Sequence, residues 1–299
     1  MNDVVFREVQ CASALNRVKG MPFDWSLNPY KGCAHSCRYC FARAYHAKMD
    51  RDIGTGFDRE IDVKINLVEV LRKELRKRPD GALAIGTATD PFQPCEGRYR
   101  LTRRSLEALV EMPMPATIIT KSTLIVRDVD VLSRLTATSG QLRVCFSIPT
   151  LDEQVSRAAE PRTPPPAQRM RALGILRRAG IDAGVLCAPV LPGLTDSEES
   201  LDRVARAAAD SGATFFGWRP LKIDPEIRDY YFGFLSAEFP VLVSAYSQLY
   251  ATGPHTNKDY QKALDLKIAN VRSRYRFVEQ PRIAVRPVAR VAQQMTLAI

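Results

Sequence analysis

The sequence predicts an α/β fold, a partial barrel of six β/α units followed by a C-terminal helical extension. Short runs rich in β-branched and aromatic residues alternate with helical patterns along most of the chain, which is typical of a parallel sheet. Polar residues follow several of these runs, at the strand ends where ligands collect in such folds. We divide the 299 residues into an N-terminal extension (1–25), a core domain (26–235) and a helical extension with a basic tail (236–299).

Five segments have the composition of strands and are bounded by turn-forming residues. They are 82–87, 116–120, 142–148, 181–189 and 214–221. In a parallel sheet the residues that follow consecutive strands meet at one edge. Those residues are Thr87 to Asp90, Lys121, Ser147 and the pair Ala188-Pro189.

Helices are predicted between and after these strands. They comprise a helix carrying Leu67, Leu71 and Leu75, the segment 165–179, a helix that begins near Thr195, and the segments 241–250 and 260–275. Asn66 is the predicted N-cap of the first helix, and Thr195 with Glu198 has the spacing of a capping box. Gly180 is a suitable C-terminal stop. A basic tail of uncertain order follows from about Phe277.

The formal charge of +10 favours an anionic partner such as nucleic acid, nucleotide or phosphate. A basic enzyme with scattered surface charges is the alternative interpretation. Part of the excess is clustered on two predicted helical stretches. The first carries Arg72, Lys73, Arg76, Lys77 and Arg78, and the second carries Lys258, Lys262, Lys267, Arg272, Arg274, Arg276, Arg282, Arg286 and Arg290.

The first twenty residues carry several charges and lack the apolar run of a signal peptide. No other stretch approaches the roughly 18 to 20 uninterrupted apolar residues of a membrane span. We therefore expect a cytoplasmic, monomeric protein without a membrane partner. In a reducing compartment its seven cysteines are expected to be thiols or metal ligands rather than disulfides.

Cys33, Cys37 and Cys40 carry the predicted chemistry, at spacings of three and two intervening residues. Three such thiolates can wrap one 4Fe-4S cubane, each on a different iron, and they leave the fourth iron without a protein ligand. The amine and carboxylate of an amino acid can chelate that iron and bring a sulfonium within reach of an electron. Reductive cleavage of the sulfonium then generates an alkyl radical, a reaction that belongs to the cofactor.

Two other interpretations of the three cysteines remain open. A structural zinc site needs four ligands, and His35 or His46 could supply the fourth. Structural zinc motifs usually contain two spaced pairs, however, rather than one cluster of three. A disulfide with one spare thiol fits poorly with the inferred compartment.

The cysteine spacing, with an aromatic residue at Tyr39 before the last cysteine, resembles the radical S-adenosylmethionine (SAM) superfamily. Within it the chain is similar to the spore photoproduct lyase group and its DNA repair photolyase-like relatives. The similarity covers roughly 28–193 through Thr87-Ala88-Thr89-Asp90, Ile119-Thr120-Lys121, Phe146-Ser147-Ile148, Glu160-Pro161, Arg169 and Ala188-Pro189. The resemblance implies a 4Fe-4S cluster and SAM as cofactors, and an external electron donor of the flavodoxin or ferredoxin type.

The resemblance also implies a set of cofactor-binding residues, namely Tyr39, Ala88, Lys121, Ser147, Arg169 and Ala188. Lys121 and Ser147 would contact the methionyl and ribose portions of SAM. The backbone near Tyr39 would meet the adenine, and the two alanines would line the pocket. On physical grounds an ammonium at a strand end suits a carboxylate. The alternatives are a surface lysine at 121 and a core hydroxyl at 147.

Two departures from the family bear on the reaction. Thr87 stands where the lyase that repairs spore DNA has a hydrogen-donating cysteine, and Phe41 stands where the family has a tyrosine. Because a hydroxyl is a much poorer hydrogen-atom donor than a thiol, we do not expect that repair reaction. Cys95 lies a short step beyond and is the candidate for a relocated donor. A thiol without a role is the alternative.

Three residues are predicted to be catalytic: Tyr39, Asp90 and Cys95. Asp90 and Glu96 flank a proline-rich turn at a strand end, where either could orient a substrate or accept a proton. Solvated loop carboxylates are the alternative. An aromatic segment near Arg219 could stack on a base or belong to the core, and it contains Phe215, Phe216 and Trp218.

The leading hypothesis is a radical SAM enzyme of the lyase or transferase type that acts on a nucleic acid or a nucleotide. A peptide or a small metabolite is the alternative substrate, and cleavage at a different S–C bond of SAM stays open. A non-catalytic nucleic-acid-binding module with a structural metal is the second hypothesis. The third is an electron-transfer protein, in which all four irons would usually have protein ligands.

Overall fold

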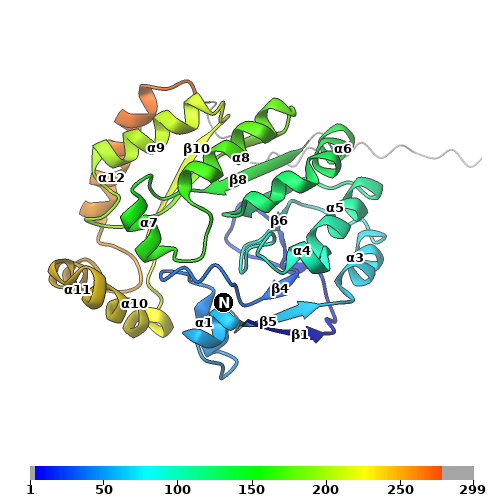
Figure 1. Ribbon diagram of the computed structural model, residues 1–299, viewed down its shortest axis with the longest axis horizontal. Coiled ribbons are helices and arrows are strands. Elements are labelled where there is room, and N and C mark those ends of the chain that lie inside the picture. The colour runs from blue at the N-terminus through cyan, green and yellow to red at the C-terminus, as the bar shows by residue number, and fades with distance from the viewer. Residues whose placement is uncertain (1–3, 140, 278–299) are drawn as a thin grey trace, which may run out of the picture.

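The computed structural model describes residues 4–139 and 141–277, and its largest feature is an open sheet of seven strands (Figure 1). These strands are β2 (Asn16–Arg17), β3 (Trp25–Leu27), β6 (Leu83–Ile85), β7 (Ala116–Thr120), β8 (Leu142–Ser147), β9 (Asp182–Val190) and β10 (Phe216–Pro220). Their order is β10-β9-β8-β7-β6-β3-β2, and only β2 runs antiparallel to its neighbour. Six parallel strands therefore follow one another in chain order, which confirms the predicted partial barrel.

The sequence predicts five of these six parallel strands, and β7 has the predicted bounds. Strand β6 ends earlier than predicted because Gly86 turns the chain with a φ of +88°. A Cβ atom there would lie 2.5 Å from the carbonyl oxygen of Ile119, so this close approach requires glycine. Strand β3 is not predicted, since three residues are too few to show an alternating pattern.

Helices cover the outer side of the sheet in an arc that Figure 1 shows from α3 round to α12. They are α3 (Leu67–Leu75), α5 (Leu101–Glu111), α6 (Val129–Ser139), α8 (Pro166–Arg178), α9 (Glu198–Asp210) and α12 (Lys258–Ser273). The first five each place a leucine of zero exposure in the main core: Leu71, Leu106, Leu135, Leu173 and Leu201. Burial of such side chains contributes roughly 1.5 to 3 kcal/mol each.

Asn66 lies at the N-cap position of α3 as predicted, but its side chain makes no capping hydrogen bond, and the predicted capping box of Thr195 and Glu198 is wrong. The Asn66 side chain instead bonds the backbone of Cys11, accepting from its N–H at 2.8 Å and donating to its carbonyl at 3.0 Å. The hydroxyl of Thr195 accepts from the N–H of Leu191 at 2.8 Å, and Ser197 caps α9. In each case the side chain forms its hydrogen bond with backbone outside the helix, although the local spacing predicted a bond to the first turn of the helix.

A second sheet of three strands lies below the opening of the main sheet in Figure 1. It consists of β1 (Val5–Val9), β5 (Glu60–Lys64) and β4 (Tyr30–Lys31), in the order β1-β5-β4. Short helices complete this side: α1 (Arg43–Ala47), α2 (Thr55–Arg59), α4 (Glu96–Tyr99), the 3-10 helix η1 (Thr123–Asp128) and α7 (Glu153–Ala159). Strand β4 leads directly into the three cysteines.

The C-terminal part of the described chain is helical, as predicted. Its elements before α12 are α10 (Pro225–Glu238), the 3-10 helix η2 (Pro240–Leu242) and α11 (Val243–Leu249). The predicted domain boundary at 235 falls within α10, and the division stays a prediction. The predicted tail lies almost wholly in 278–299, outside the described residues. Among the described helices, none has the length and apolar character needed to cross a bilayer.

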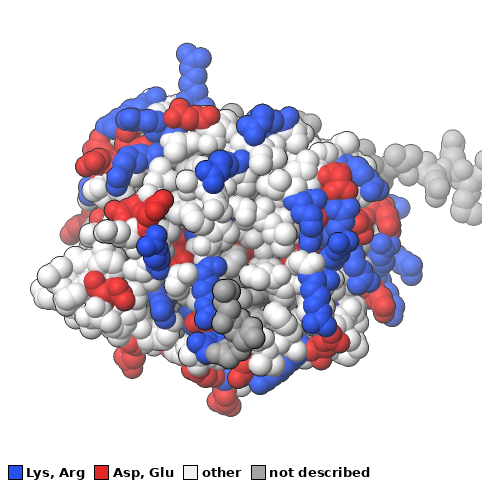
Figure 2. Space-filling view, in the orientation of Figure 1, with Lys and Arg blue, Asp and Glu red and all other residues white. Residues whose placement is uncertain are grey.

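Figure 2 shows Lys and Arg side chains gathered over α3, α4 and α5, with Asp and Glu among them. One of the predicted basic residues, Arg72, pairs with Glu111 of α5. The aromatic residues Phe215 and Phe216 are almost fully buried, as the core interpretation expects. Phe216 stacks on Phe277 with ring centroids 5.6 Å apart.

Candidate active site

The three cysteines lie in the segment between β4 and α1, which we call the cysteine loop (33–40). The loop is tightly wound, since Gly32 and Ser36 have φ angles of +81° and +57°. A Cβ atom at Gly32 would lie 2.8 Å from the carbonyl oxygen of Glu60, so glycine is required there. The N–H of Cys33 donates to the carbonyl of Phe57 at 3.0 Å. The second sheet and α2 thus fix the start of the loop.

Arg43 holds the middle of the cysteine loop, a role that the sequence did not reveal. Its side chain is fully buried. Nε and Nη2 donate to the carbonyl of Cys37 at 3.1 and 3.0 Å, and Nη1 donates to the carbonyl of Ile53 at 2.6 Å. Nη2 also pairs with Asp58 at 2.7 Å. The guanidinium therefore ties the cysteine loop to the chain that follows α1.

The segment after β6 forms the other side of the site. The amide of Asn28 accepts from the N–H of Ala88 at 2.8 Å and donates to the hydroxyl of Thr87 at 3.2 Å. The side chain of Gln93 accepts from the N–H of Ala34 at 2.9 Å. These contacts join the strand-end segment to the cysteine loop, so the predicted pocket-lining Ala88 packs beside the cysteines.

Asp90 is buried and both of its carboxylate oxygens are occupied. Oδ1 accepts from the N–H of Phe92 at 2.9 Å and from the hydroxyl of Thr120 at 2.8 Å. Oδ2 accepts from the N–H of Lys121 at 2.7 Å and lies 3.3 Å from Nδ1 of His35. Burial alone would raise the pKa of Asp90, but His35 and the hydrogen bonds outweigh it and lower the pKa. Asp90 therefore joins the ends of β6 and β7 to the cysteine loop.

We expect Asp90→Asn to lower the free energy of unfolding by about 3 kcal/mol at pH 7, because an amide cannot accept all of these bonds. The folded pKa of Asp90 is lowered, so its contribution is fully present above the unfolded value of about 3.9. The contribution is lost as the pH falls through the folded pKa. Urea unfolding at pH 7 and near pH 3 checks this, and a gap between the two proteins that widens in acid would contradict it.

Beside the cysteine loop lies a largely buried polar group of residues that we call the Glu160 cluster: Tyr39, Lys121, Ser147, Glu160, Arg169 and the carbonyl of Ala188. Glu160 accepts the hydroxyl hydrogen of Tyr39 and pairs with Nη2 of Arg169 at 2.5 Å. Nζ of Lys121 lies 3.8 Å from Glu160 and donates to the hydroxyl of Ser147 at 2.7 Å. That hydroxyl donates in turn to the carbonyl of Ala188 at 2.8 Å.

The charges of the Glu160 cluster stabilise one another. Burial would raise the pKa of Glu160, but Arg169 and Lys121 outweigh it and lower the pKa. Burial would lower the pKa of Lys121, whereas the charges of Cys37 and Glu160 raise it. Burial and Glu160 both raise the pKa of Tyr39. The cluster thus holds an ionised carboxylate, a charged ammonium and a neutral phenol.

The structure brings five of the six predicted cofactor-binding residues into this one cluster, and the sixth, Ala88, packs beside the cysteines. Glu160 at its centre belongs to a motif of the predicted family, but its role was missed. A glutamate followed by proline has the sequence pattern of a solvated loop. Its partners Tyr39 and Lys121 are far away along the chain, so no local signal identifies it.

The structure does not bring Cys95 into the same group. Its thiol is buried with Tyr30, Ile61 and Val63, between the second sheet and α4, in a hydrophobic cluster separate from those of the cysteine loop. Burial and the neighbouring Glu96 raise the pKa of the Cys95 thiol to about 12. Glu96 is itself buried rather than solvated, and it accepts the hydroxyl hydrogen of Tyr30.

Comparison with known proteins identifies the family. The model described as "Radical SAM superfamily" matches residues 27–205. The chain belongs to the radical SAM superfamily. An uncharacterized protein of Mycobacterium tuberculosis is 39% identical over 290 residues, which cover 94% of this chain and 84% of that protein. The Radical SAM Nalpha-GlyT isomerase of Pseudomonas phage M6 is 28% identical over 187 residues, which cover 60% of this chain and 36% of the isomerase.

Solved structures of spore photoproduct lyase share the fold of this radical SAM protein. A mutant with bound AdoMet and dinucleoside spore photoproduct matches with a TM-score of 0.70 and 15% identity, over 91% of this chain and 79% of the lyase. The match confirms the predicted resemblance to the spore photoproduct lyase group. Membership of the radical SAM superfamily implies that the protein is an enzyme that uses SAM and an iron–sulfur cluster.

The thiols of the cysteine loop fit such a cluster. Burial, with contributions from neighbouring groups, raises the pKa of Cys33 and Cys40, and it raises that of Cys37 to about 12. Since the thiolate is the ligand, cluster assembly must displace these protons. No group of three or more His, Cys, Asp or Glu side chains among the described residues is gathered tightly enough for a single metal ion.

The Glu160 cluster fits the polar groups of SAM. The side chain of Lys121 retains 16% exposure, whereas that of Glu160 retains 2%. Nζ of Lys121 lies 5.6 Å from the centre of the Tyr39 ring, which leaves the charge between the phenol and the Ser147 hydroxyl. An ammonium and hydroxyls suit a carboxylate and a ribose respectively.

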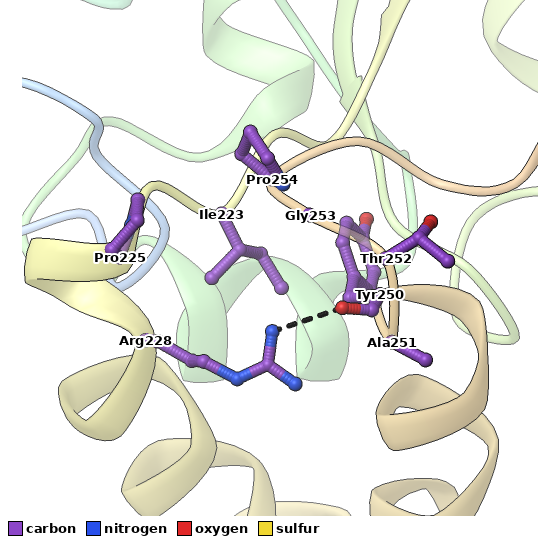
Figure 3. Close-up of a pocket in the computed structure, with 8 residues that line it drawn as sticks. All are labelled: Ile223, Pro225, Arg228, Tyr250, Ala251, Thr252, Gly253 and Pro254. Atoms are coloured by element: carbon purple, nitrogen blue, oxygen red, sulfur yellow. Dashed lines mark hydrogen bonds between the residues drawn. The ribbon is translucent and has the colours of Figure 1, made fainter.

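A separate cavity of about 320 Å³ lies between the start of α10 and the segment after α11 (Figure 3). Arg228 reaches across it and donates to the carbonyl of Tyr250 at 3.1 Å. Ile223 and Pro254 form apolar parts of its wall. None of the predicted site residues lines this cavity, so it is distinct from the radical SAM site.

Proposed function

We propose that this chain uses a 4Fe-4S cluster on Cys33, Cys37 and Cys40 to cleave SAM reductively and to start radical chemistry on a nucleic acid or a nucleotide. The observation that carries the proposal is the Glu160 cluster, whose charged side chains lie beside the cysteine loop. The bound cofactors supply the one-electron cleavage of the sulfonium. The chain's own residues bind SAM, orient it and shield it from water.

Each residue of the Glu160 cluster has a proposed task. The Lys121 ammonium binds the carboxylate of SAM, and the Ser147 hydroxyl contacts its ribose. Glu160 keeps Lys121 charged and positioned, and Arg169 neutralises the remaining charge of Glu160. Arg169 also donates to the carbonyl of Ser147 at 3.0 Å, which fixes the end of β8. The backbone near Tyr39 meets the adenine.

Of the three predicted catalytic residues, we keep Tyr39 as the first candidate because its hydroxyl lies within the Glu160 cluster. All the contacts of Asp90 favour a positioning task, and the burial of Cys95 in another cluster makes it the weaker hydrogen donor. Thr87 supports a reaction different from that of spore photoproduct lyase. The electron comes from an external donor of the flavodoxin or ferredoxin type.

The net charge and the relatives support a nucleic acid or a nucleotide as substrate. The formal charge is +10, and positive proteins favour phosphate-bearing partners. A spore photoproduct lyase has been solved with a dinucleoside spore photoproduct bound. A peptide or a small metabolite is the competing substrate class.

Anaerobic reconstitution tests the proposal. We expect the purified chain to show the spectrum of a 4Fe-4S cluster, to change its electron paramagnetic resonance (EPR) signal on addition of SAM, and to convert SAM to methionine and a nucleoside with dithionite. A chain that holds zinc and leaves SAM intact would instead be a binding module. A cluster that ignores SAM would indicate an electron carrier. Deuterated candidate substrates that transfer label to 5′-deoxyadenosine identify the substrate class.

A further inference from the structure

A cavity of about 450 Å³ opens next to the cysteine loop, at the carboxyl ends of the parallel strands. Its wall is built from the segment after β6, from η1 after β7, from the segment after α7 and from His35 of the loop. Small-molecule sites typically measure about 300 to 1,000 Å³. The cavity is therefore large enough for one nucleoside-sized group directly beside the proposed chemistry.

Arg162 gives this cavity its charge. The side chain is exposed, and it has no hydrogen bond or ion pair with any residue in the described part of the chain. The nearby carboxylate of Glu160 is already committed to Arg169 and Tyr39, so it does not neutralise Arg162. A free guanidinium is a planar fork of donors that matches the oxygens of a phosphate.

The rest of the wall suits a flat group with apolar faces. Phe92, Leu124 and Pro164 supply carbon surface, and the Thr123 hydroxyl adds a polar group that makes no hydrogen bond within the described residues. Apolar walls with a few convergent polar groups are typical of sites that orient one ligand. A base with its attached phosphate has both features.

Basic side chains continue on both sides of the cavity. Arg98, Arg100 and Arg104 are exposed on the side of α4 and α5, and Arg157 is exposed on α7. Figure 2 shows Lys and Arg over α4 and α5 and beside α7, with a less charged surface between them. Charges placed this way would face the phosphates of a strand that crosses the cavity.

We propose that this cavity binds one nucleotide unit of the substrate, with Arg162 on its phosphate, and that the flanking arginines hold neighbouring phosphates when the substrate is a strand. The inference rests on the proposed function, and it names the substrate class and the subsite. A peptide would meet the same arginine through a carboxylate, but it would not use the three arginines on the side of α4 and α5 together with Arg157 on α7.

Two charge-matched variants test the proposal on the reconstituted protein. The probes are a nucleoside 5′-monophosphate, followed by calorimetry, and a labelled single-stranded oligonucleotide, followed by fluorescence anisotropy between about 50 and 200 mM salt. We expect Arg162→Ala to weaken binding of both probes by about 10-fold, the effect of losing about 1.4 kcal/mol. Arg157→Ala removes the same charge outside the cavity, so it should weaken only the oligonucleotide, by a smaller factor that vanishes at high salt.

A third variant separates the cavity from its charge. Leu124→Trp fills the cavity and keeps Arg162, and it should abolish binding of the monophosphate. Equal effects of Arg162→Ala and Arg157→Ala on the oligonucleotide, or monophosphate binding that ignores both Arg162→Ala and Leu124→Trp, would overturn the subsite. Binding of the monophosphate without binding of the oligonucleotide would identify a free nucleotide as the substrate.

SAM cleavage without either probe is measured on the same samples, so the two proposals can fail separately. A protein that cleaves SAM but binds neither probe refutes the nucleotide subsite and leaves radical SAM chemistry in place. A protein that binds the probes through Arg162 but never cleaves SAM refutes the proposed function instead.

Discussion

Cys40→Ala is expected to lose the iron–sulfur cluster and to reduce SAM cleavage by about 1,000-fold or more, the order found when an essential catalytic group is removed. The proposed cubane uses three thiolates for three of its irons and leaves the fourth iron open. The variant would offer only two thiols. The fold should survive, because the backbone bonds from Cys40 to Cys37 and from Arg43 to Cys40 do not use the thiol. Iron and sulfide analysis, the EPR spectrum and SAM turnover measure the effect.

Cys11→Ala is the matched control, because Cys11 is also a half-buried free cysteine but lies outside the cysteine loop. We expect this variant to keep the cluster and full turnover. Wild-type iron content and turnover in Cys40→Ala would show that the ligand set is wrong. Equal losses in both variants would point to a general effect of removing a thiol rather than to ligation.

The elements that could be predicted from the sequence are those with a local or strictly topological signal. The spacing of the three cysteines is local. Lys121 follows β7, Ser147 ends β8 and Ala188 lies near the end of β9, and parallel β/α topology brings such residues to one edge. Their hydrogen-bonded contact in the structure is therefore a consequence of the alternating pattern.

Glu160 and Arg43 could not be predicted, because burial changes what a charged side chain does. On the sequence alone, each has the pattern of a solvated residue, since glutamate and arginine are mostly exposed in proteins. Their roles depend on partners that the fold supplies: Tyr39 lies 121 residues from Glu160, and Arg43 bonds carbonyl groups of two loops. The pattern of apolar and polar residues along the chain does not predict such long-range contacts.

Cys95 shows the limit of arguing from short sequence distance. It lies five positions after Asp90, yet the chain turns through Pro91 and Pro94 so that the thiol packs against the second sheet. That sheet contains β4, only two residues long, and β1 from the N-terminal extension. Because neither strand was predicted, the sequence did not indicate that Cys95 would pack against a second sheet rather than lie at the active site.

Glu160→Gln should destabilise the fold by about 4 kcal/mol and weaken SAM binding by about 10- to 100-fold. The first figure is typical of a buried ion pair that loses one partner, because the buried Arg169 and the partly buried Lys121 would remain without their counter-charge. The second is the range found when a residue that orients a ligating side chain is replaced. Urea unfolding and calorimetric titration with SAM measure the two effects.

Glu153→Gln on the neighbouring helix α7 is the matched control, because the side chain of Glu153 is exposed and lines no part of the Glu160 cluster. It should change neither quantity. The two effects of Glu160→Gln also separate the tasks of the carboxylate. A loss of stability with unchanged SAM affinity would mean that Glu160 supports the fold through Arg169 but does not position Lys121. SAM affinity is measured well below the unfolding midpoint, where both proteins are folded. A lower affinity of Glu160→Gln under these conditions would mean that Glu160 holds Lys121 in place.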